Sequence, residues 1–389
     1  MLIQIHMLQN YAPSNLNRDD TGSPKDAIFG GATRGRISSQ CLKRSIRKSQ
    51  TFADAFKDDG LLGERTKQLP AMIQKELEAL DADKDTITAI VSRVPEIGRE
   101  SKKKKKEQDE DEVAEETATE IEGEGIAGET KQLIFLDRKT EARPLAEKLL
   151  AIFKKVGAKE WTKLKIPDIT KDLDPSVPRS IDIAMFGRMT TSQAFKNVQA
   201  SVQVAHALSA NALKTEFDYY TAMDDLKPDG VPGADMIGDV EFNSCTYYKY
   251  INVSWDGLLS NLGKDNIEIA RRAVPALLEA AATAHPSGKQ NAFGAFNLPD
   301  FVLVEVSERN LPVSYVNAFV VPVSGNNYQS LLTNSVTALS TYASRLTKAY
   351  NLEAQRAYMS VEGLPFMNLK ATPSINDLKQ WLETQLPTL

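Results

Sequence analysis

Positive side chains gather on one side of a predicted helix close to the N-terminus. The pattern of residue types predicts a helix over residues 39–49, capped by Ser38 or Ser39. One stripe of this helix is small or apolar, and the opposite stripe holds Gln40, Lys43, Arg44, Arg47 and Lys48. Like charges one turn apart repel, and the helix contains no acid. A phosphate backbone would relieve the repulsion, and unpaired amides at the helix N-terminus could bind a phosphate oxygen. The alternative is a basic face covered only by water.

More cations precede this helix. Residues 1–50 hold eight Lys or Arg against three Asp, in a chain whose formal net charge is −5. The cations before the helix are Arg18, Lys25, Arg34 and Arg36. This uneven distribution indicates a polyanionic partner, RNA or DNA. The glycine-rich stretch 30–35 fits neither a dinucleotide motif nor a P-loop, and favours backbone clearance beside a bound strand.

Aspartates near the basic segment offer a different chemistry. Carboxylates could hold Mg²⁺ for phosphodiester cleavage, and the candidates are Asp19, Asp20 and Asp26, or the pair Asp224 and Asp225. They could equally cap loops, or pair with Arg18 and Lys25. No general base or nucleophile motif accompanies them. We therefore expect a protein that is not an enzyme and carries no cofactor.

Tyr219, Tyr220 and Thr221 form a third candidate group. They follow a predicted amphipathic helix over 200–213 and precede a segment rich in Pro and Gly. Neighbouring aromatic side chains on a projecting segment can stack on bases or wedge between them. Two adjacent tyrosines are nevertheless more often part of a core. His206, inside that predicted helix, is better explained as a packed or hydrogen-bonded histidine than as a ligand.

Several classes of protein are excluded by composition. The two cysteines, Cys41 and Cys245, cannot form a zinc ribbon or a disulfide framework, and the three histidines are scattered. A reduced, cytoplasmic location fits this cysteine usage best. No run of about 18 apolar residues predicts a membrane span, and the N-terminus lacks the features of a signal peptide.

The elements that must position these residues combine strands and helices. Ile3, Ile5 and Met7 alternate with polar residues, which predicts an N-terminal strand with one apolar face. Residues 11–35 read as a long loop. Further strands are predicted over 240–253, 301–306 and 313–323, and further helices near 70–92, 143–157, 328–350 and 375–386. This order favours an α+β fold with a mixed or antiparallel sheet.

Residues 101–130 differ from the rest of the chain. They contain five Lys and eleven Asp or Glu, and only three residues among Leu, Ile, Val and Phe. Such a segment cannot bury enough apolar surface to offset its ordering entropy. We expect a solvated, disordered insertion. Contact between its lysine run and nucleic acid is a weaker alternative, because the adjacent acids oppose it.

Long blocks of sequence resemble one known family. SNLNRDDTGSPKDAIFGG followed by RGRISSQCLKRSIRKS is similar to the signature of the Cascade backbone subunit of type I-E CRISPR systems, the CasC family. Further blocks agree in order: DIAMFGRM, VAHAL leading into FDYYTAMDDL, EFNSCTYYKYINV and HPSGKQNAFGAFNLPDFVLV. The resemblance spans nearly the whole chain and weakens in 51–180, where the acidic insertion is a departure.

The resemblance implies a modified RNA-recognition-motif (ferredoxin-like) palm sheet with a helical finger insertion and an extended thumb. On this basis residues 1–50 supply a palm strand, the basic loop and the basic helix, and 51–180 the finger region. Residues 181–250 supply the thumb with flanking palm strands, and 251–389 the remaining palm strands and C-terminal helices.

The resemblance also implies site residues. RNA-contacting positions of the family fall on Arg18, Lys25, Ser38, Gln40, Lys43, Arg47 and Met189. The thumb tip, which displaces a guide base at regular intervals, falls on Tyr219, Tyr220 and Thr221. The family has Trp-Phe-Thr at this tip in one member, so Tyr-Tyr-Thr keeps a stacking surface with a different shape.

The implied function is a non-catalytic backbone that polymerises along CRISPR RNA and presents the guide to target DNA. Its implied partners are CRISPR RNA, target DNA, other copies of itself, a recruited helicase-nuclease, and the large, small, guide-5′-end and guide-processing Cascade subunits, with no membrane. One alternative is a related backbone subunit that cleaves target RNA with a loop aspartate and Mg²⁺. Another is an unrelated, sequence-neutral single-stranded RNA-binding protein.

Overall fold

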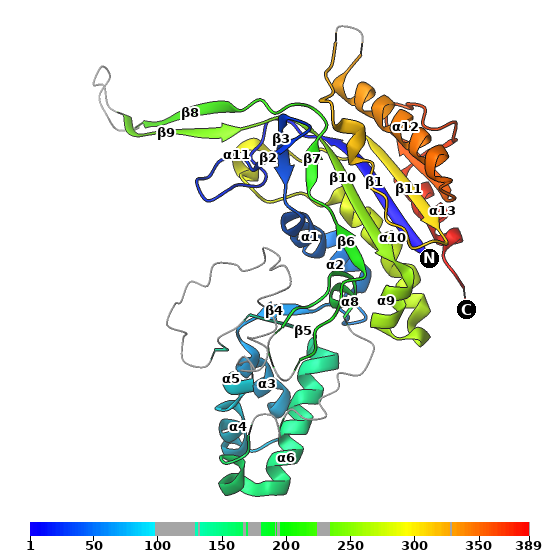
Figure 1. Cartoon of the computed structure of the whole chain (residues 1–389). Helices are drawn as coiled ribbons and strands as arrows, with labels where there is room; N and C mark the ends of the chain where they lie inside the picture. Colours follow the sequence, from blue (N-terminus) through cyan, green and yellow to red (C-terminus); the bar gives the residue numbers. More distant parts are fainter. Residues whose placement is uncertain are drawn as a thin grey trace. The chain divides into compact units, whose positions relative to one another are not determined.

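A computed structural model describes residues 1–97, 129–130, 133–165, 169, 180–190, 192, 195–223, 234–326 and 329–388 (Figure 1). Most of the charged segment 101–130 and the Asp224–Asp225 pair therefore lie outside the described residues. The chain divides into two units. The first unit comprises Met1–Phe52, Gln203–Ser254 and Val274–Thr388. The second unit comprises Ala53–Val202 and Trp255–Ala273. Each unit thus combines segments that are far apart in sequence.

A mixed sheet forms the centre of the first unit. In the described residues it has nine strands in the order β13-β12-β11-β1-β10-β7-β3-β2, with β6 added beside β10. In that order β13 and β12 pair in parallel. Each neighbouring pair from β12 through β11, β1, β10, β7 and β3 to β2 is antiparallel. The strands are β1 (Leu2–Asn10), β2 (Asp26–Phe29), β3 (Ala32–Ile37), β6 (Val202–Val204), β7 (Ala207–Ser209), β10 (Thr246–Ser254), β11 (Phe301–Ser307), β12 (Gln355–Ser360) and β13 (Ala371–Thr372).

Helices accompany this sheet. They are α1 (Ser39–Arg47), α11 (Gln290–Phe293), α12 (Leu331–Tyr350) and α13 (Ile375–Gln385), with a 3-10 turn over Val316–Phe319. Two more, α2 (Gln50–Phe56) and α10 (Ile267–Thr283), continue along the chain from one unit into the other. The helices predicted over 39–49, 328–350 and 375–386 are confirmed, as is the α+β class with a mixed sheet.

The first strand is buried on both faces, so the prediction of a single apolar face is wrong. β1 lies between β10 and β11 and pairs antiparallel with both. Gln4 and His6 are 5% and 0% exposed. Leu8, on the same face of the strand, packs with Phe301 and with Leu339 of α12 in one apolar cluster. The polar groups are satisfied locally, since Gln4 Oε1 accepts from the Tyr250 hydroxyl at 2.6 Å.

The helix predicted over residues 200–213 is wrong. The structure has two short strands there, β6 and β7, and both pair with β10. Backbone bonds fasten the segment to that strand, from the Ala205 amide to the Tyr250 carbonyl and from the Ala210 amide to the Thr246 carbonyl. The segment forms strands despite its helical spacing of apolar residues, because the edge of β10 offers hydrogen-bond partners for its backbone groups.

The strand predicted over 313–323 is also wrong. Except for the 3-10 turn, this segment is an irregular loop between Pro312 and Pro322. Two of its amides bond to side chains instead of a neighbouring strand. The Val313 amide donates to Gln4 Oε1 at 2.7 Å, and the Tyr315 amide donates to the Tyr248 hydroxyl at 2.9 Å. Proline lacks an amide donor, which limits strand pairing at both ends.

The predicted loop 11–35 contains a hairpin formed by β2 and β3. Gly30 and Gly31 make its two-residue turn with φ of +61° and +76°, a conformation that glycine adopts without strain. A Cβ on Gly30 would lie 1.9 Å from the Val320 carbonyl oxygen. Gly30 thus serves the turn and the contact with Val320, and Gly31 serves the turn, while the expected clearance beside a bound strand stays a prediction.

A separate two-stranded sheet extends from the first unit. β8 (Glu216–Met223) and β9 (Ala234–Phe242) pair antiparallel, from Glu216 opposite Phe242 to Met223 opposite Ala234 (Figure 1). Their connection, residues 224–233, lies outside the described residues. This β8–β9 hairpin carries the three thumb-tip candidates.

The second unit is mainly helical. Its elements are β4 (Glu64–Thr66), α3 (Leu69–Glu78), α4 (Lys84–Val91), α5 (Val94–Ile97), β5 (Ile134–Leu136), a π-helical turn (Arg138–Ala142), α6 (Arg143–Trp161), α8 (Ile181–Phe186), α9 (Trp255–Leu262) and a 3-10 turn (Lys264–Asn266). Trp161 anchors the core, because its indole donates to the Ala89 carbonyl at 3.0 Å and Arg93 packs over its ring. The helices predicted near 70–92 and 143–157 are confirmed.

Within the described ranges, none of the helices is long and apolar enough to cross a bilayer.

Candidate nucleic-acid interface

The basic helix forms as the sequence predicts. Ser38 caps α1, and its hydroxyl accepts from the Cys41 amide at 3.3 Å. Leu42 and Ile46 are buried, while the stripe with Gln40, Lys43, Arg44, Arg47 and Lys48 is half-buried or exposed. In the described part of the chain Lys43, Arg44 and Lys48 form no ion pair. The cations in the last turn also interact favourably with the negative end of the helix dipole. This interaction explains part of the positive charge without a ligand.

The amides at the start of α1 are not free for a phosphate, so that expectation is wrong. The Ser38 amide donates to Asn17 Oδ1 at 2.8 Å, and the Ser39 amide donates to His206 Nδ1 at 3.2 Å. The Cys41 amide is taken by the cap. Side chains thus satisfy the helix end, leaving the cations as the means of holding an anion. His206 is the hydrogen-bonded histidine that we expected, although it lies between β6 and β7 and not in a helix.

Asn17 holds the loop cations beside the start of α1. Its carbonyl accepts from the Lys25 amide at 2.8 Å, while its side chain accepts from Ser38 as above. Arg18 is exposed and bridges to Pro24. These bonds bring Arg18, Lys25 and the N-terminus of α1 together on the first unit. In the described chain neither Arg18 nor Lys25 pairs with an acid.

Arg34 does not belong to this cationic surface. Its side chain is 0% exposed and donates to four backbone carbonyls: Ser209 at 3.0 Å, Ala210 at 2.9 Å, Phe319 at 2.8 Å and Val320 at 3.1 Å. It therefore joins β3 to the end of β7 and to the 3-10 turn. Its use toward a polyanion, which the sequence suggested, is wrong because no donor faces solvent.

The carboxylate of Asp19 shapes the loop. Asp19 Oδ1 accepts from the Thr21 amide at 2.9 Å, the Thr21 hydroxyl at 2.8 Å and the Ser23 amide at 3.0 Å. The bond from the Thr21 hydroxyl is the main reason that the pKa of Asp19 is lowered. For Asp19 the loop-capping alternative is therefore confirmed. Among the residues that the structure describes, no three His, Cys, Asp or Glu gather as a metal site.

The thumb-tip candidates lie on β8. Tyr219 and Tyr220 are 64% and 45% exposed, and Thr221 is exposed. Tyr220 pairs with Gly238 of β9, and a Cβ on that glycine would lie 2.6 Å from the Tyr220 ring. The Tyr220 ring thus covers the glycine, whereas Tyr219 faces the opposite side of the hairpin. The two tyrosines therefore differ in how much ring surface is available to a base, and the core alternative is wrong for both.

Met189 lies in the second unit and is 77% exposed. The two residues before it fix its position. Gly187 has φ of +77°, and a Cβ there would lie 2.8 Å from the Val198 carbonyl oxygen. Arg188 is buried and donates to the Glu141 carboxylate at 2.7 Å. Within the GRM motif, the turn and the buried arginine thus present the methionine outward.

The sequence patterns did not single out a buried lysine, Lys249. Lys249 is 3% exposed in β10, with its ammonium 5.9 Å from the centre of the Tyr11 ring. Burial lowers its pKa to about 7. Tyr11 in turn contacts His285 Nδ1 at 3.3 Å. The signal was a lone lysine between Tyr248 and Tyr250 in an otherwise uncharged strand.

Comparison with known proteins gives the family. Residues 3–381 match the profile of Cas_CT1975, described as CT1975-like protein. The chain belongs to this CT1975-like family of Cas proteins. Among curated proteins there is no significant match.

Solved structures agree with the family. The CT1975-like chain shares 28% identity and a TM-score of 0.76 with a chain from "CRISPR RNA-guided surveillance complex, pre-nicking", covering 99% of this chain and 100% of that one. A chain from "CRISPR RNA-guided surveillance complex" has 22% identity and a TM-score of 0.60, with 99% of each covered, which supports the fold alone. The prediction of a Cascade-type Cas protein is confirmed at this level.

Proposed function

We propose that this CT1975-like protein is a non-catalytic backbone subunit of the type I-E CasC kind. It polymerises along CRISPR RNA and presents the guide for pairing with target DNA in antiviral defence. The observation that carries the proposal is the basic surface on the first unit. There the exposed stripe of α1 lies next to Arg18 and Lys25, which Asn17 fastens in place.

This surface suits phosphates more than bases. Its cations, Arg18, Lys25, Lys43 and Arg47, end in groups that bind phosphate oxygens, and phosphate contacts fix register without reading sequence. A backbone that must accept any guide needs that property, because Watson–Crick pairing supplies the specificity. Ser38 and Gln40 belong to the same helix end, where Ser38 acts through its cap.

The remaining elements take the parts that the family resemblance implies. The mixed sheet is the modified RNA-recognition-motif palm, residues 51–180 are the finger region, and the β8–β9 hairpin belongs to the thumb region 181–250. The thumb contacts the next copy and displaces one guide base with Tyr219, Tyr220 and Thr221, while Met189 lies beside the guide. Its further partners are the other Cascade subunits and a recruited helicase-nuclease.

The test removes two cations from α1. The double variant Lys43→Ala/Arg47→Ala should weaken binding similarly for unrelated RNA sequences. The log–log salt slope should become shallower by up to about one unit for each phosphate that the variant no longer neutralises. Filter binding across several salt concentrations measures both quantities. The matched control is Lys154→Ala/Lys155→Ala, which removes two exposed cations from α6 of the second unit. If the α1 and α6 variants behave alike, the assignment of α1 fails.

The same preparation distinguishes the catalytic rival. Complexes assembled on guide RNA are incubated with matched RNA and DNA in Mg²⁺ or Mn²⁺. We expect that neither the RNA nor the DNA is cleaved. Chelator-sensitive cleavage that Asp20→Ala or Asp26→Ala abolishes would identify a related RNA-cleaving backbone subunit instead.

A further inference from the structure

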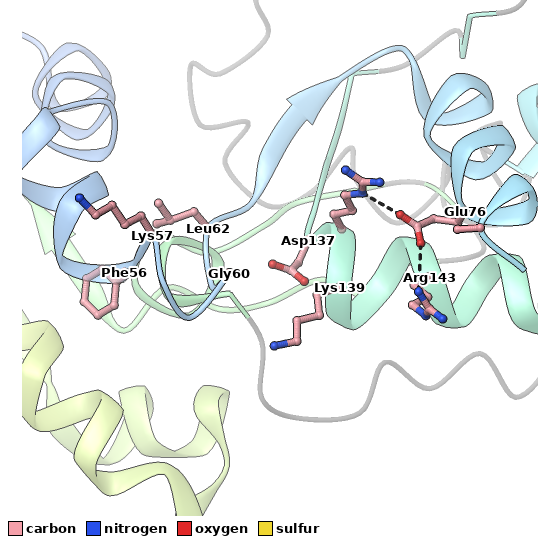
Figure 2. A pocket seen from close by; sticks show the side chains of 10 residues that line it. Phe56, Lys57, Gly60, Leu62, Glu76, Asp137, Lys139 and Arg143 are labelled. Atoms are coloured by element: carbon pink, nitrogen blue, oxygen red, sulfur yellow. Dashed lines mark hydrogen bonds and ion pairs between the residues drawn. The ribbon is translucent and has the colours of Figure 1, made fainter.

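A pocket of about 430 Å³ lies in the second unit, and none of the RNA-contact candidates named above lines it (Figure 2). Its lining comes from the end of α2 and the following turn, from α3, and from the start of α6 with the π-helical turn before it. Leu62 and Ala79 supply apolar wall, and charged side chains surround the rest. This volume is in the range of about 300–1,000 Å³ that is usual for small-molecule sites.

Asp137 contributes a carboxylate oxygen without a partner. Its side chain is 1% exposed, and Oδ1 caps the π-helical turn by accepting from the Thr140 amide at 2.6 Å and hydroxyl at 2.8 Å. Oδ2 has no hydrogen-bond partner in the described protein. Figure 2 shows the carboxylate pointing toward the Gly60 side of the pocket. A buried polar atom left unpaired costs free energy, so a ligand that donates an N–H there would be favoured.

The other charges of the pocket are mainly positive. Glu76 is buried and already paired, with Arg138 Nε at 2.7 Å and Arg143 at 3.8 Å (Figure 2). Lys57 and Lys139 add two more cations to the lining, and Lys57 Nζ already pairs with Asp54 Oδ1 at 3.2 Å. Lys139 forms no ion pair in the described chain. Arg143 Nε also pairs with Glu147 Oε1 at 3.1 Å, so Lys139 is the lining cation that no carboxylate neutralises in the described chain, and it favours an anionic group beside it.

We propose that this pocket binds a nucleotide whose base donates an N–H to Asp137 Oδ2 while Lys139 holds its phosphate. Guanine fits best, because its edge carries adjacent N1–H and N2–H donors. Uracil fits worse, since its single N3–H lies between two carbonyl oxygens that a carboxylate repels. The flat base packs against Leu62. The site goes beyond guide binding at α1, because it would recognise an unpaired nucleotide through its base.

An acidic peptide is the competing ligand class. Its carboxylates could bind the same lysine, Lys139, and a backbone amide could donate to Asp137. A peptide, however, exposes its amide beside its own carbonyl and side chain, whereas guanine presents two neighbouring donors without an acceptor between them. The observations therefore favour the nucleotide.

Isothermal titration of the full chain tests the proposal with GMP, UMP, guanosine, inorganic phosphate and hexaglutamate. GMP should bind saturably and more tightly than UMP, guanosine or phosphate. Asp137→Asn keeps an N-cap oxygen but replaces the free acceptor by a donor. It should reduce the preference for GMP over UMP by at least about tenfold. Equal affinity for GMP and UMP, no saturable GMP binding, or tighter binding of hexaglutamate would each overturn the proposal.

Asp83 provides a matched control. It caps α4 in the same way, accepting from the Thr86 amide at 2.9 Å and hydroxyl at 2.7 Å, but does not line the pocket. Asp83→Asn should leave the preference unchanged, and an equal loss in both variants would overturn the assignment. If Asp137→Asn lowers the melting temperature, Lys139→Gln decides instead. This variant should weaken the binding of GMP but not that of guanosine. An equal loss of affinity for both ligands would refute a contact between Lys139 and the phosphate.

The measurements are repeated in the Lys43→Ala/Arg47→Ala background. Nucleotide binding in the pocket should persist there, so the outcome is independent of guide binding at α1. Disappearance of GMP binding in that background would place it at α1 and overturn the pocket.

Discussion

Individual polar residues in the core of the first unit carry charges that the fold must satisfy. Glu305 is 1% exposed and accepts from His6 Nε2 at 3.1 Å, from the Tyr315 hydroxyl at 2.9 Å and from Arg356. Tyr248 completes the cluster through His6 Nδ1 at 2.8 Å. Burial opposes the carboxylate charge, but the bond from His6 and the charges of His6 and Arg356 outweigh it. The pKa of Glu305 is thereby lowered to about 2.

Glu305→Gln should destabilise the protein by about 3–5 kcal/mol at neutral pH, because it leaves Arg356 and His6 without their buried partner. The folded pKa lies below the ordinary value of 4.5. The stabilisation by the carboxylate is therefore complete above that value and is lost as the pH falls from 4.5 toward 2. Urea unfolding of wild type and variant across this range is the measurement. A difference that stays constant down to pH 2 would contradict the charged assignment.

Lys249 should also make the protein more stable as the pH rises, but in a more alkaline range. Its pKa of about 7 lies below the ordinary 10.5, so burial of the charged form is costly at or below pH 7. As the pH rises from 7 to 10.5 the folded lysine is neutral and this cost disappears. Lys249→Met should therefore raise the melting temperature most at pH 6, by roughly 2–4 °C for each kcal/mol gained, and less at pH 9. An equal gain at both pH values would show that the ammonium is not desolvated.

At the scale of elements, the β8–β9 hairpin separates two tyrosines that the sequence presents together. An isolated two-stranded hairpin is only marginally stable, so contacts across it matter. The Tyr220 ring provides one such contact by covering Gly238. Tyr219, at 64% exposure, keeps its ring free for a base.

Tyr219→Ala should therefore abolish the proposed base displacement in assembled complexes, while Tyr220→Phe, which keeps the ring on Gly238, should not. Displaced bases tolerate target mismatches, so wild type should show mismatch-tolerant positions at regular intervals. Removing base–aromatic stacking worth about 1–3 kcal/mol should abolish that periodicity in Tyr219→Ala. Target affinity with a mismatch at each guide position measures it. Unchanged periodicity in Tyr219→Ala would exclude this tyrosine as the wedge.

For the whole molecule, the head-to-tail contact that we propose between copies predicts assembly that follows RNA length. Such heterologous contacts repeat without closing and so generate filaments along the guide. The mass of the complex should increase in equal steps as the RNA is lengthened, and a scrambled RNA of the same length should give the same mass. Mass photometry on an RNA series measures the steps. A single copy on every RNA would favour the alternative of a sequence-neutral protein that acts alone.

The sequence by itself determined the features that depend on local chemistry. Helix α1 follows from its own apolar stripe and its Ser38 cap, and the basic stripe opposite could be recognised without any tertiary contact. The long motif blocks likewise sufficed to indicate a Cas protein, which the family match confirms.

Tertiary structure alone decided the features that depend on long-range partners. Arg34 is not part of the basic surface, because its guanidinium donates to four backbone carbonyls from residues 209–210 and 319–320. Two short parts of the segment 200–213, residues 202–204 and 207–209, became strands because they pair with β10. The free oxygen of Asp137 and the cover that Tyr220 forms over Gly238 also depend on residues distant in sequence. Local propensity cannot encode such contacts, since burial and pairing are set only when the distant segments meet.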